Sequence, residues 1–148
     1  ALRGQGQRAY TYFAENAPAA QNDRAEVRHL EPYCYGQFTE GPASKHFGRS
    51  QVHWLTGTAS TVMVGCVEGI LGLRPDLDGL RLAPAIPREW TGFTMDKDFR
   101  GCRLHIRVEN PHHRESGFTS LTFNGRELPD AYIPAALLTR ETEVCLIL

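Results

Sequence analysis

The sequence predicts an α+β chain in which the last helices of a helical domain, residues 1–75, precede an antiparallel β-sandwich, residues 76–148. Two observations predict this fold. Apolar residues recur at helical spacing in the first half, whereas after residue 76 they alternate with polar residues as in half-buried strands. In addition, the stretch 58–72 is apolar nearly all round, so we expect it to be buried inside a larger helical body.

Three stretches of the first half carry helical signals. Residues 3–17 place apolar side chains on one face and end before a proline, and residues 21–31 form a second, shorter stretch bounded by Pro32. The third stretch, residues 58–72, starts on a threonine that can cap a helix and ends at Gly72, which is a typical stop residue.

The second half carries strand signals. The segment "CRLHIRVEN" alternates Leu104, Ile106 and Val108 with polar residues, which is typical of a half-buried strand. A second strand is expected in "FTSLTF", before the hairpin turn signal "NG", and a third in "TEVCLIL" at the end. The proline-rich "LAPAIPREW" is expected to connect strands, because proline interrupts helices and permits only edge strands.

Composition excludes several classes of protein. The 148 residues suffice for one core, and a net charge of -1 argues against nucleic-acid binding, which needs a concentrated basic face. No apolar run approaches the roughly 20 residues of a membrane span. The chain lacks a signal segment and an initiator Met, so we expect a piece of a longer cytoplasmic protein.

The cysteines and histidines do not have metal-ligand spacing. The four cysteines contain no Cys-x-x-Cys pair, so we expect free buried thiols in a reducing compartment. His112 and His113 are adjacent and have no third ligand nearby, which favours a solvated loop, and His105 is expected to be structural. We therefore expect no metal.

The segment "HWLTGTAS" can bind an anion. The first turn of a helix has unpaired N–H groups, which favour anions. The hydroxyls of Thr56 and Thr58 can donate to phosphate oxygens, and Gly57 lets an oxygen approach the backbone closely. On this pattern alone the signal is weak, because a threonine before a helix is more often a simple cap.

Four motifs together resemble the C-terminal part of glycoside hydrolase family 94, which comprises inverting cellobiose, chitobiose and cellobionic acid phosphorylases and related cyclic glucan enzymes. They are "EPYCYGQFTEGP", "FGRSQVHWLTGTAS", "GILGLRPDLDGLRLAPAIPREWTGF" and "FRGCRLHIRVENP". The resemblance extends from about residue 5 to residue 110 and is weaker beyond. It implies the end of an (α/α)6 barrel followed by a jelly-roll-like β-sandwich.

The resemblance also implies site residues. Thr56 and Gly57 correspond to the threonine and glycine that bind the attacking phosphate, and Gln37 to a glutamine at the sugar site. Tyr35 or Tyr33 would suit stacking on the apolar face of a pyranose, although both could be core aromatics.

Further positions near the phosphate motif follow from its sequence context. Arg49, His53 and Thr58 are possible neighbours of the phosphate. Many relatives have Arg-Asn-Ser-Trp here, whereas this chain has Ser-Gln-Val-His-Trp at 50–54, which leaves the role of His53 open and points to the cellobionic acid subgroup. Glu31 could brace the loop that carries Gln37 or be an exposed cap.

No catalytic residue is expected in this chain. The family's general acid is an Asp upstream of these residues, as are an Arg and a His of the phosphate site. None of the chain's aspartates stands in the required motif: Asp23, Asp76, Asp78, Asp96, Asp98 and Asp130. No cofactor is expected, because inorganic phosphate is a co-substrate.

The resemblance implies an inverting disaccharide phosphorylase that cleaves a β-glucoside, such as cellobiose or cellobionic acid, to α-glucose 1-phosphate. Its expected partners are the disaccharide, phosphate, the remainder of the polypeptide and a second copy in a homodimer. The chain alone would be inactive. Two alternatives stay open: a non-catalytic carbohydrate-binding or structural β-sandwich module, and a module of a cyclic β-1,2-glucan synthase.

Overall fold

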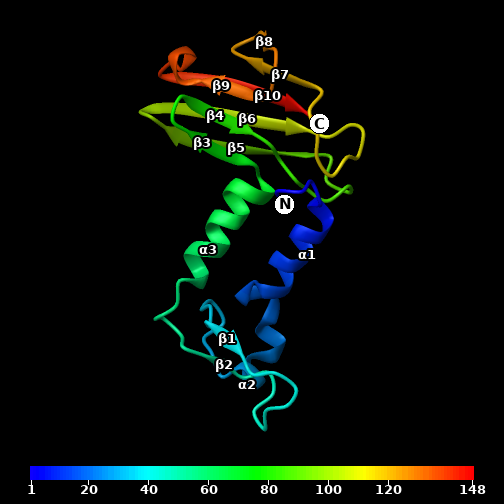
Figure 1. The fold of residues 1–148 in the computed structure, drawn as a ribbon, viewed down its shortest axis with the longest axis vertical. Coiled ribbons are helices and arrows are strands. Elements are labelled where there is room, and N and C mark those ends of the chain that lie inside the picture. The colour runs from blue at the N-terminus through cyan, green and yellow to red at the C-terminus, as the bar shows by residue number, and fades with distance from the viewer. The chain divides into compact units, whose positions relative to one another are not determined.

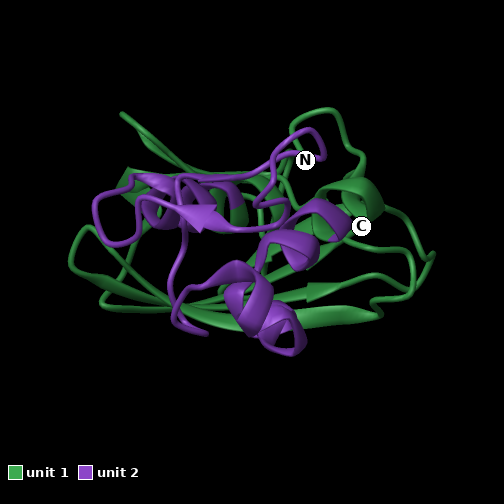
Figure 2. Cartoon of the chain, turned by 90° about the horizontal axis from the view of Figure 1, so that it is seen from below, with its two compact units in different colours: residues 1–10, 66–148 green, residues 11–65 purple.

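The computed structural model describes all residues from 1 to 148 and divides into two compact units (Figure 2). Unit 1 contains residues 1–10 and 66–148, and unit 2 contains residues 11–65. Unit 1 holds the strands of two larger sheets, and unit 2 holds short helices and a small hairpin. None of the helices combines the length and the hydropathy that a membrane crossing requires.

Unit 1 is built from two sheets (Figure 1). The larger sheet has five strands, in the order β5 (Gly92–Phe99), β6 (Cys102–Glu109), β10 (Glu141–Ile147), β7 (Ser120–Phe123) and β8 (Arg126–Leu128). The smaller sheet has three strands, in the order β3 (Leu73–Asp76), β4 (Gly79–Leu82) and β9 (Tyr132–Pro134), and a short 3-10 turn, η3 (Ala135–Leu137), follows β9. This arrangement is consistent with the predicted β-sandwich.

The core of unit 1 follows the predicted alternation. Along β6, the side chains of Leu104, Ile106 and Val108 are buried, while the residues between them are half-buried or exposed. Leu80 of the smaller sheet and Leu121 of the larger one are fully buried as well. Because burial of a large aliphatic side chain contributes roughly 1.5–3 kcal/mol, these rows are the main source of stability in unit 1.

One strand pairing differs from the antiparallel prediction. β10 runs antiparallel to β7 but parallel to β6, with Glu141 opposite Arg103 and Val144 opposite Ile106. Every other strand pair is antiparallel. The alternation of buried residues is the same in both kinds of pairing, so hydrophobic periodicity could not distinguish them.

The first turn of α1 (Gly6–Asn16) is held by unit 1. The backbone N–H of Gln7 donates to the Glu115 carboxylate at 3.2 Å, and Arg88 donates to the same carboxylate at 3.0 Å. A Cβ on Gly6 would lie 2.1 Å from the carbonyl oxygen of Ile86, so only glycine fits there. The backbone N–H of Gln7, the Arg88 side chain and the backbone N–H of Gly6 hold the pKa of Glu115 below its ordinary value of 4.5.

The second predicted helical stretch is shorter and tighter than expected. It consists of a 3-10 segment, η1 (Pro18–Arg24), and a single α-helical turn, α2 (Ala25–Arg28). His29 ends α2 in the left-handed conformation, with its N–H donating to the carbonyl of Ala25 at 2.9 Å.

The third predicted helix is confirmed as continuous helical structure. Its second half, however, is a π-helix and not an α-helix. α3 (Thr58–Val64) continues as a π-helical segment, η2 (Gly65–Ile70), and Gly72 then turns the chain with a φ of 76°. A Cβ on Gly72 would lie 2.2 Å from the backbone of Ala83, which explains the glycine at this helix stop.

The expected burial of the third helix is found only near its end, where Gly69 and Ile70 of η2 are buried. No residue of α3 is buried, and Met63 and Val64 are 69% and 53% exposed. Unit 2 therefore leaves the apolar surface of this helix without the packing partners that its sequence calls for.

Candidate phosphate and sugar site

A hollow in unit 2 brings the two strongest sequence predictions together. It has a volume of about 350 Å³. Its lining residues come from the start of the small hairpin and the start of α3: Gln37, Leu55, Thr56, Gly57, Thr58, Thr61 and Val62. The glutamine predicted for the sugar site and the threonines and glycine predicted for the phosphate site thus share one hollow.

The small hairpin positions Gln37. It pairs β1 (Phe38–Thr39) with β2 (Ser50–Gln51), and the backbone N–H of Gln37 donates to the carbonyl of Gln51 at 2.9 Å. The side-chain amide of Gln37 makes no hydrogen bond within the chain and is exposed, so it is free to bind a ligand in the hollow.

The two threonine hydroxyls form a pair at the start of α3. The Oγ1 atoms of Thr56 and Thr58 lie 2.7 Å apart, and the backbone N–H of Thr58 donates to Thr56 Oγ1 at 3.1 Å. Thr56 Oγ1 thus accepts the N–H of the first helical residue, although the N-cap position itself is Gly57 and no side chain makes the N-cap hydrogen bond. The pair has two hydroxyl hydrogens and uses only one of them internally, so the other can donate to an anion in the hollow.

Gly57 leaves its side of the hollow open. Its N–H makes no hydrogen bond within the chain, and a Cβ built on it would have nothing within 4 Å. Its φ is -79°, so the backbone does not require glycine. Its carbonyl accepts hydrogen bonds from the hydroxyls of Ser60 and Thr61 at 2.9 and 3.0 Å, which fixes the first turn. The absence of a side chain matters here only for what enters the hollow.

Sequence reasoning missed three residues of the lining. Leu55 precedes the motif and is 87% exposed, and Thr61 and Val62 follow Thr58 by three and four residues. That spacing places Thr61 and Val62 on the same helix face as Thr58, so the helical period alone could have identified them.

His53 and Trp54 are directed to Glu31 instead of to the hollow. Glu31 accepts a hydrogen bond from the Trp54 indole at 3.1 Å, and His53 Nδ1 lies 3.9 Å from the other carboxylate oxygen. The pKa of Glu31 lies below its ordinary value because its own backbone N–H and the Trp54 indole donate to it. Glu31 thus braces the segment before the Thr-Gly-Thr motif.

The backbone of this segment is unusual. Val52 and Trp54 have positive φ values of 56° and 64°, and the N–H of Leu55 donates to the carbonyl of His53 at 2.7 Å. Positive φ is uncommon for residues other than glycine and costly for a β-branched one. The tight turn at Trp54 separates His53 from the residues that line the hollow.

The remaining predicted site residues also lie outside the hollow. Arg49 lines a different depression of unit 2, together with His29 and Lys45. Tyr35 is half-buried and does not line the hollow, whereas Tyr33 is 70% exposed and packs edge-on against Trp54 with ring centroids 6.1 Å apart.

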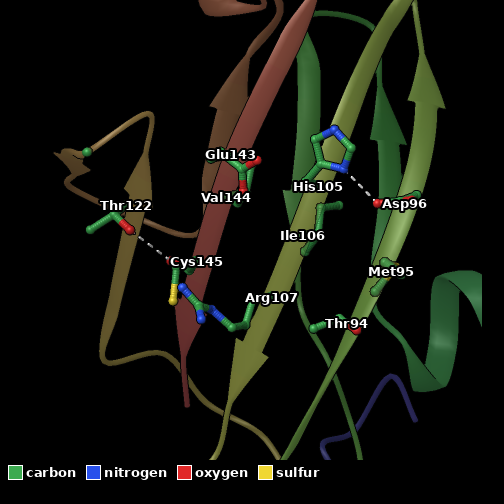
Figure 3. Close-up of a pocket in the computed structure, with 11 residues that line it drawn as sticks. Thr94, Met95, Asp96, His105, Ile106, Arg107, Thr122, Glu143, Val144 and Cys145 are labelled. Carbon is green, nitrogen blue, oxygen red and sulfur yellow. Dashed lines mark hydrogen bonds and ion pairs between the residues drawn. The ribbon is translucent and has the colours of Figure 1, made fainter.

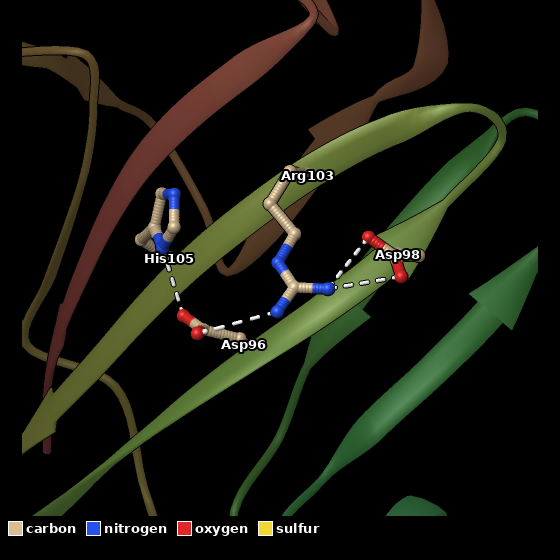
Figure 4. Close-up of polar contacts among 4 residues, drawn as sticks. All are labelled: Asp96, Asp98, Arg103 and His105. Atoms are coloured by element: carbon tan, nitrogen blue, oxygen red, sulfur yellow. Dashed lines mark hydrogen bonds and ion pairs between the residues drawn. The ribbon is translucent and has the colours of Figure 1, made fainter.

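A larger hollow, of about 460 Å³, lies on the outer face of the five-stranded sheet (Figure 3). Two of its charged side chains pair with each other, and a neighbouring arginine that does not line the hollow is paired as well. His105 pairs with Asp96 at 2.8 Å, and Arg103 contacts both Asp98 at 2.9 Å and Asp96 at 3.4 Å (Figure 4). The hydrogen bond from His105 is the main cause that lowers the pKa of Asp96. We interpret these side chains as a solvent-exposed polar surface with a structural role.

The cysteines and histidines form no metal site. No three side chains of the metal-ligating types lie close enough to hold a metal ion. His113 contacts the carbonyl oxygen of Arg88 at 2.9 Å. All four cysteines are free thiols, but only Cys34 is buried, and partial burial raises the pKa of Cys66.

Both parts of the chain match family models of glycosyl hydrolases. Residues 1–72 match the family model of the glycosyl hydrolase 94 superfamily catalytic domain, and residues 73–127 match that of the glycosyl hydrolase family 65 C-terminal domain. The resemblance to family 94 is thereby confirmed, and residues 1–72 belong to the glycosyl hydrolase 94 superfamily.

Most of the relatives found are named as phosphorylases, and one is a cyclic beta-(1,2)-glucan synthase of Rhizobium meliloti, which is 34% identical over 84 residues. The chain is 38% identical over 133 residues to N,N'-diacetylchitobiose phosphorylase of Vibrio proteolyticus, and 39% identical over 145 residues to that of Vibrio furnissii. These alignments cover 90% and 98% of this chain but only 17% and 18% of the relatives. A cellobionic acid phosphorylase of Neurospora crassa is 29% identical over 119 residues, which are 77% of this chain and 15% of that protein.

Proposed function

We propose that this chain is the C-terminal part of an inverting disaccharide phosphorylase, and that the hollow of unit 2 binds phosphate and sugar. The observation that carries the proposal is the meeting of Gln37 with Thr56, Gly57 and Thr58 around one hollow. Phosphate would accept hydrogen bonds from a threonine hydroxyl and from the Gly57 N–H. The Gln37 amide would bind a hydroxyl of the sugar.

The residue types in the hollow suit a site that binds phosphate and sugar but does not supply the catalytic acid. Phosphate replaces the water of an inverting hydrolase, so the reaction needs one carboxylic acid for the leaving oxygen and no carboxylate base. No carboxylate lines the hollow. Its residues would therefore position the phosphate and donate hydrogen bonds to it, while the general acid is expected from a preceding part of the protein.

The proposal includes a helical barrel. The exposed side chains of Trp54, Leu55, Met63 and Val64 are apolar and lie close to one another in the sequence, around the Thr-Gly-Thr motif. Further helices of an (α/α)6 barrel would bury them, with residues 1–75 as the end of the barrel and residues 76–148 as the following β-sandwich. A homodimer in the cytoplasm belongs to the same proposal.

The proposed substrate is a β-linked disaccharide, with N,N'-diacetylchitobiose as the first candidate. Its support is the higher identity to the two chitobiose phosphorylases than to the cellobionic acid phosphorylase. The residues at 50–54 predicted membership of the cellobionic acid subgroup. This difference in identity does not support that prediction. The comparisons do not favour a non-catalytic binding module.

The test is phosphorolysis by the intact protein. Each of N,N'-diacetylchitobiose, cellobiose and cellobionic acid is incubated with and without phosphate, and the sugar 1-phosphate is quantified. We expect phosphate-dependent formation of the α-anomer from at least one of these disaccharides. Phosphate-independent hydrolysis, or no cleavage of any of them, would contradict the proposal.

A further inference from the structure

A second depression of unit 2 is lined mostly by basic side chains. It has a volume of about 310 Å³ and shares no residue with the Thr-Gly-Thr hollow. Four of its six lining residues are basic and the other two are apolar: His29, Lys45, His46, Arg49, Val27 and Phe47. No carboxylate lines it. We call it the basic hollow.

The loop that carries three of the four basic residues is held by its own backbone. The N–H of Glu40 donates to the carbonyl of Arg49 at 2.9 Å, and the N–H of Gly48 donates to the carbonyl of Glu40 at 3.0 Å. Within the loop, the N–H of His46 donates to the Ser44 hydroxyl at 3.0 Å. Lys45, His46 and Arg49 are therefore presented from ordered backbone.

The loop lies directly against α2. Gly48 has a φ of 89°, and a Cβ built on it would lie 2.7 Å from Val27 Cγ1. A side chain at this position would push the loop away from α2, so glycine is what brings the loop and the end of α2 together. His29, in its left-handed conformation at the end of α2, joins the loop residues there.

The four basic side chains have no counter-charge within the chain. None of His29, Lys45, His46 and Arg49 forms a side-chain hydrogen bond or an ion pair. The carboxylate of the nearby Glu40 accepts a hydrogen bond from Gln51 instead. On the sheet face, by contrast, Arg103 is paired with aspartates. Basic groups that converge without a carboxylate create a positive potential that attracts an anion.

The apolar lining indicates a ligand that has an apolar face in addition to an anionic group. The ring of Phe47 is 58% exposed, and Val27 is 46% exposed. An exposed aromatic ring offers a stacking surface for the apolar face of a pyranose. The volume also reaches the lower end of small-molecule pockets, roughly 300–1,000 Å³, which is more than inorganic phosphate needs.

We propose that the basic hollow binds a sugar phosphate, with Lys45 and Arg49 on the phosphate group and the Phe47 ring against the sugar. The two histidines would add hydrogen bonds to the phosphate oxygens. This site goes beyond the proposed function, because it uses none of the residues proposed to bind the attacking phosphate and the sugar being cleaved.

The test measures binding, by calorimetric titration of the intact protein with glucose 1-phosphate and with inorganic phosphate, without any acceptor sugar. In Thr56→Val protein, binding at the basic hollow should persist. In the double variant Lys45→Gln with Arg49→Gln, this binding should weaken by roughly tenfold or more, since hydrogen bonds to charged groups are lost. The matched control is Arg126→Gln with Arg140→Gln, which removes the same charge from exposed arginines of unit 1.

Phe47→Ala tests the sugar part of the proposal. It should weaken binding of glucose 1-phosphate several-fold and leave inorganic phosphate unchanged, because only the sugar contacts the ring. Equal affinities of Lys45→Gln/Arg49→Gln and the control double variant would overturn the site. Equal weakening of both ligands by Phe47→Ala would overturn the assignment of a sugar phosphate. Neither result depends on whether the protein phosphorolyses a disaccharide.

Discussion

The substitution Thr56→Val separates the hydrogen bonds that Thr56 makes within the chain from the phosphate binding that we propose for it. Valine keeps the shape of threonine but has no hydroxyl. It therefore removes the acceptor of the Thr58 N–H, at 3.1 Å, and the hydroxyl partner of Thr58 Oγ1, at 2.7 Å. It also removes the hydroxyl that would donate to phosphate.

The expected magnitudes of the two losses differ. Loss of the hydroxyl that accepts the Thr58 N–H costs about 0.5–1.5 kcal/mol, and the partial exposure of Thr56 favours the lower half of that range. Loss of a hydrogen bond to a charged group costs about 1.5–3 kcal/mol, which corresponds to a roughly ten- to hundredfold weaker response to phosphate. Helix formation should survive, because the carbonyl of Gly57 still accepts from the N–H and hydroxyl of Thr61.

The assay follows phosphorolysis by the intact protein as a function of phosphate concentration, and thermal unfolding of the same preparation. Thr56→Ser is the matched control, because serine keeps the hydroxyl and should retain most of the response to phosphate. If thermal stability falls in Thr56→Val while phosphate saturation does not move, Thr56 is a cap only and the phosphate assignment is wrong.

Three further outcomes are expected. Gly57→Ala should leave the melting temperature nearly unchanged, since its Cβ meets no protein atom within 4 Å, but should weaken phosphate saturation; unchanged kinetics would exclude close approach of phosphate. Gln37→Ala should lower kcat/KM for the sugar by an amount that corresponds to roughly 1–3 kcal/mol. Kinetics unchanged from those of the unsubstituted protein, in both reaction directions, would remove Gln37 from the site. Glu115→Gln should lower the melting temperature at neutral pH and lose this effect in acid. The folded-state pKa of Glu115 is depressed, so its contribution is present above the ordinary value of 4.5 and disappears as pH falls through the folded pKa; a difference that persists in acid would contradict this.

The sequence predicted the elements that local patterns determine. The alternation over 102–110 identified β6, and the apolar run after Thr58, with Gly72 beyond its end, identified the continuous helical segment over Thr58–Ile70. The parallel pairing of β6 with β10 could not be predicted, because it depends on how distant strands meet and leaves no trace in the period of either strand.

The part of the hollow formed by Thr56, Gly57 and Thr58 is continuous in the sequence and could be predicted from the motif alone. Gln37 and Thr56 line one hollow, although only the family resemblance connected them in the sequence. His53 and Arg49 do not line this hollow, although they are close to the motif in the sequence. The positive φ values at Val52 and Trp54 turn the chain between these residues and the motif, and neither valine nor tryptophan signals such a turn.

The most direct measurement is a crystal structure of the intact protein with phosphate and a β-linked disaccharide. Our account predicts phosphate within hydrogen-bonding distance of the Thr56 hydroxyl and the Gly57 N–H, with a sugar hydroxyl on the Gln37 amide. Phosphate bound away from Thr56 and Gly57, with the hollow filled only by water or by protein side chains, would contradict the account.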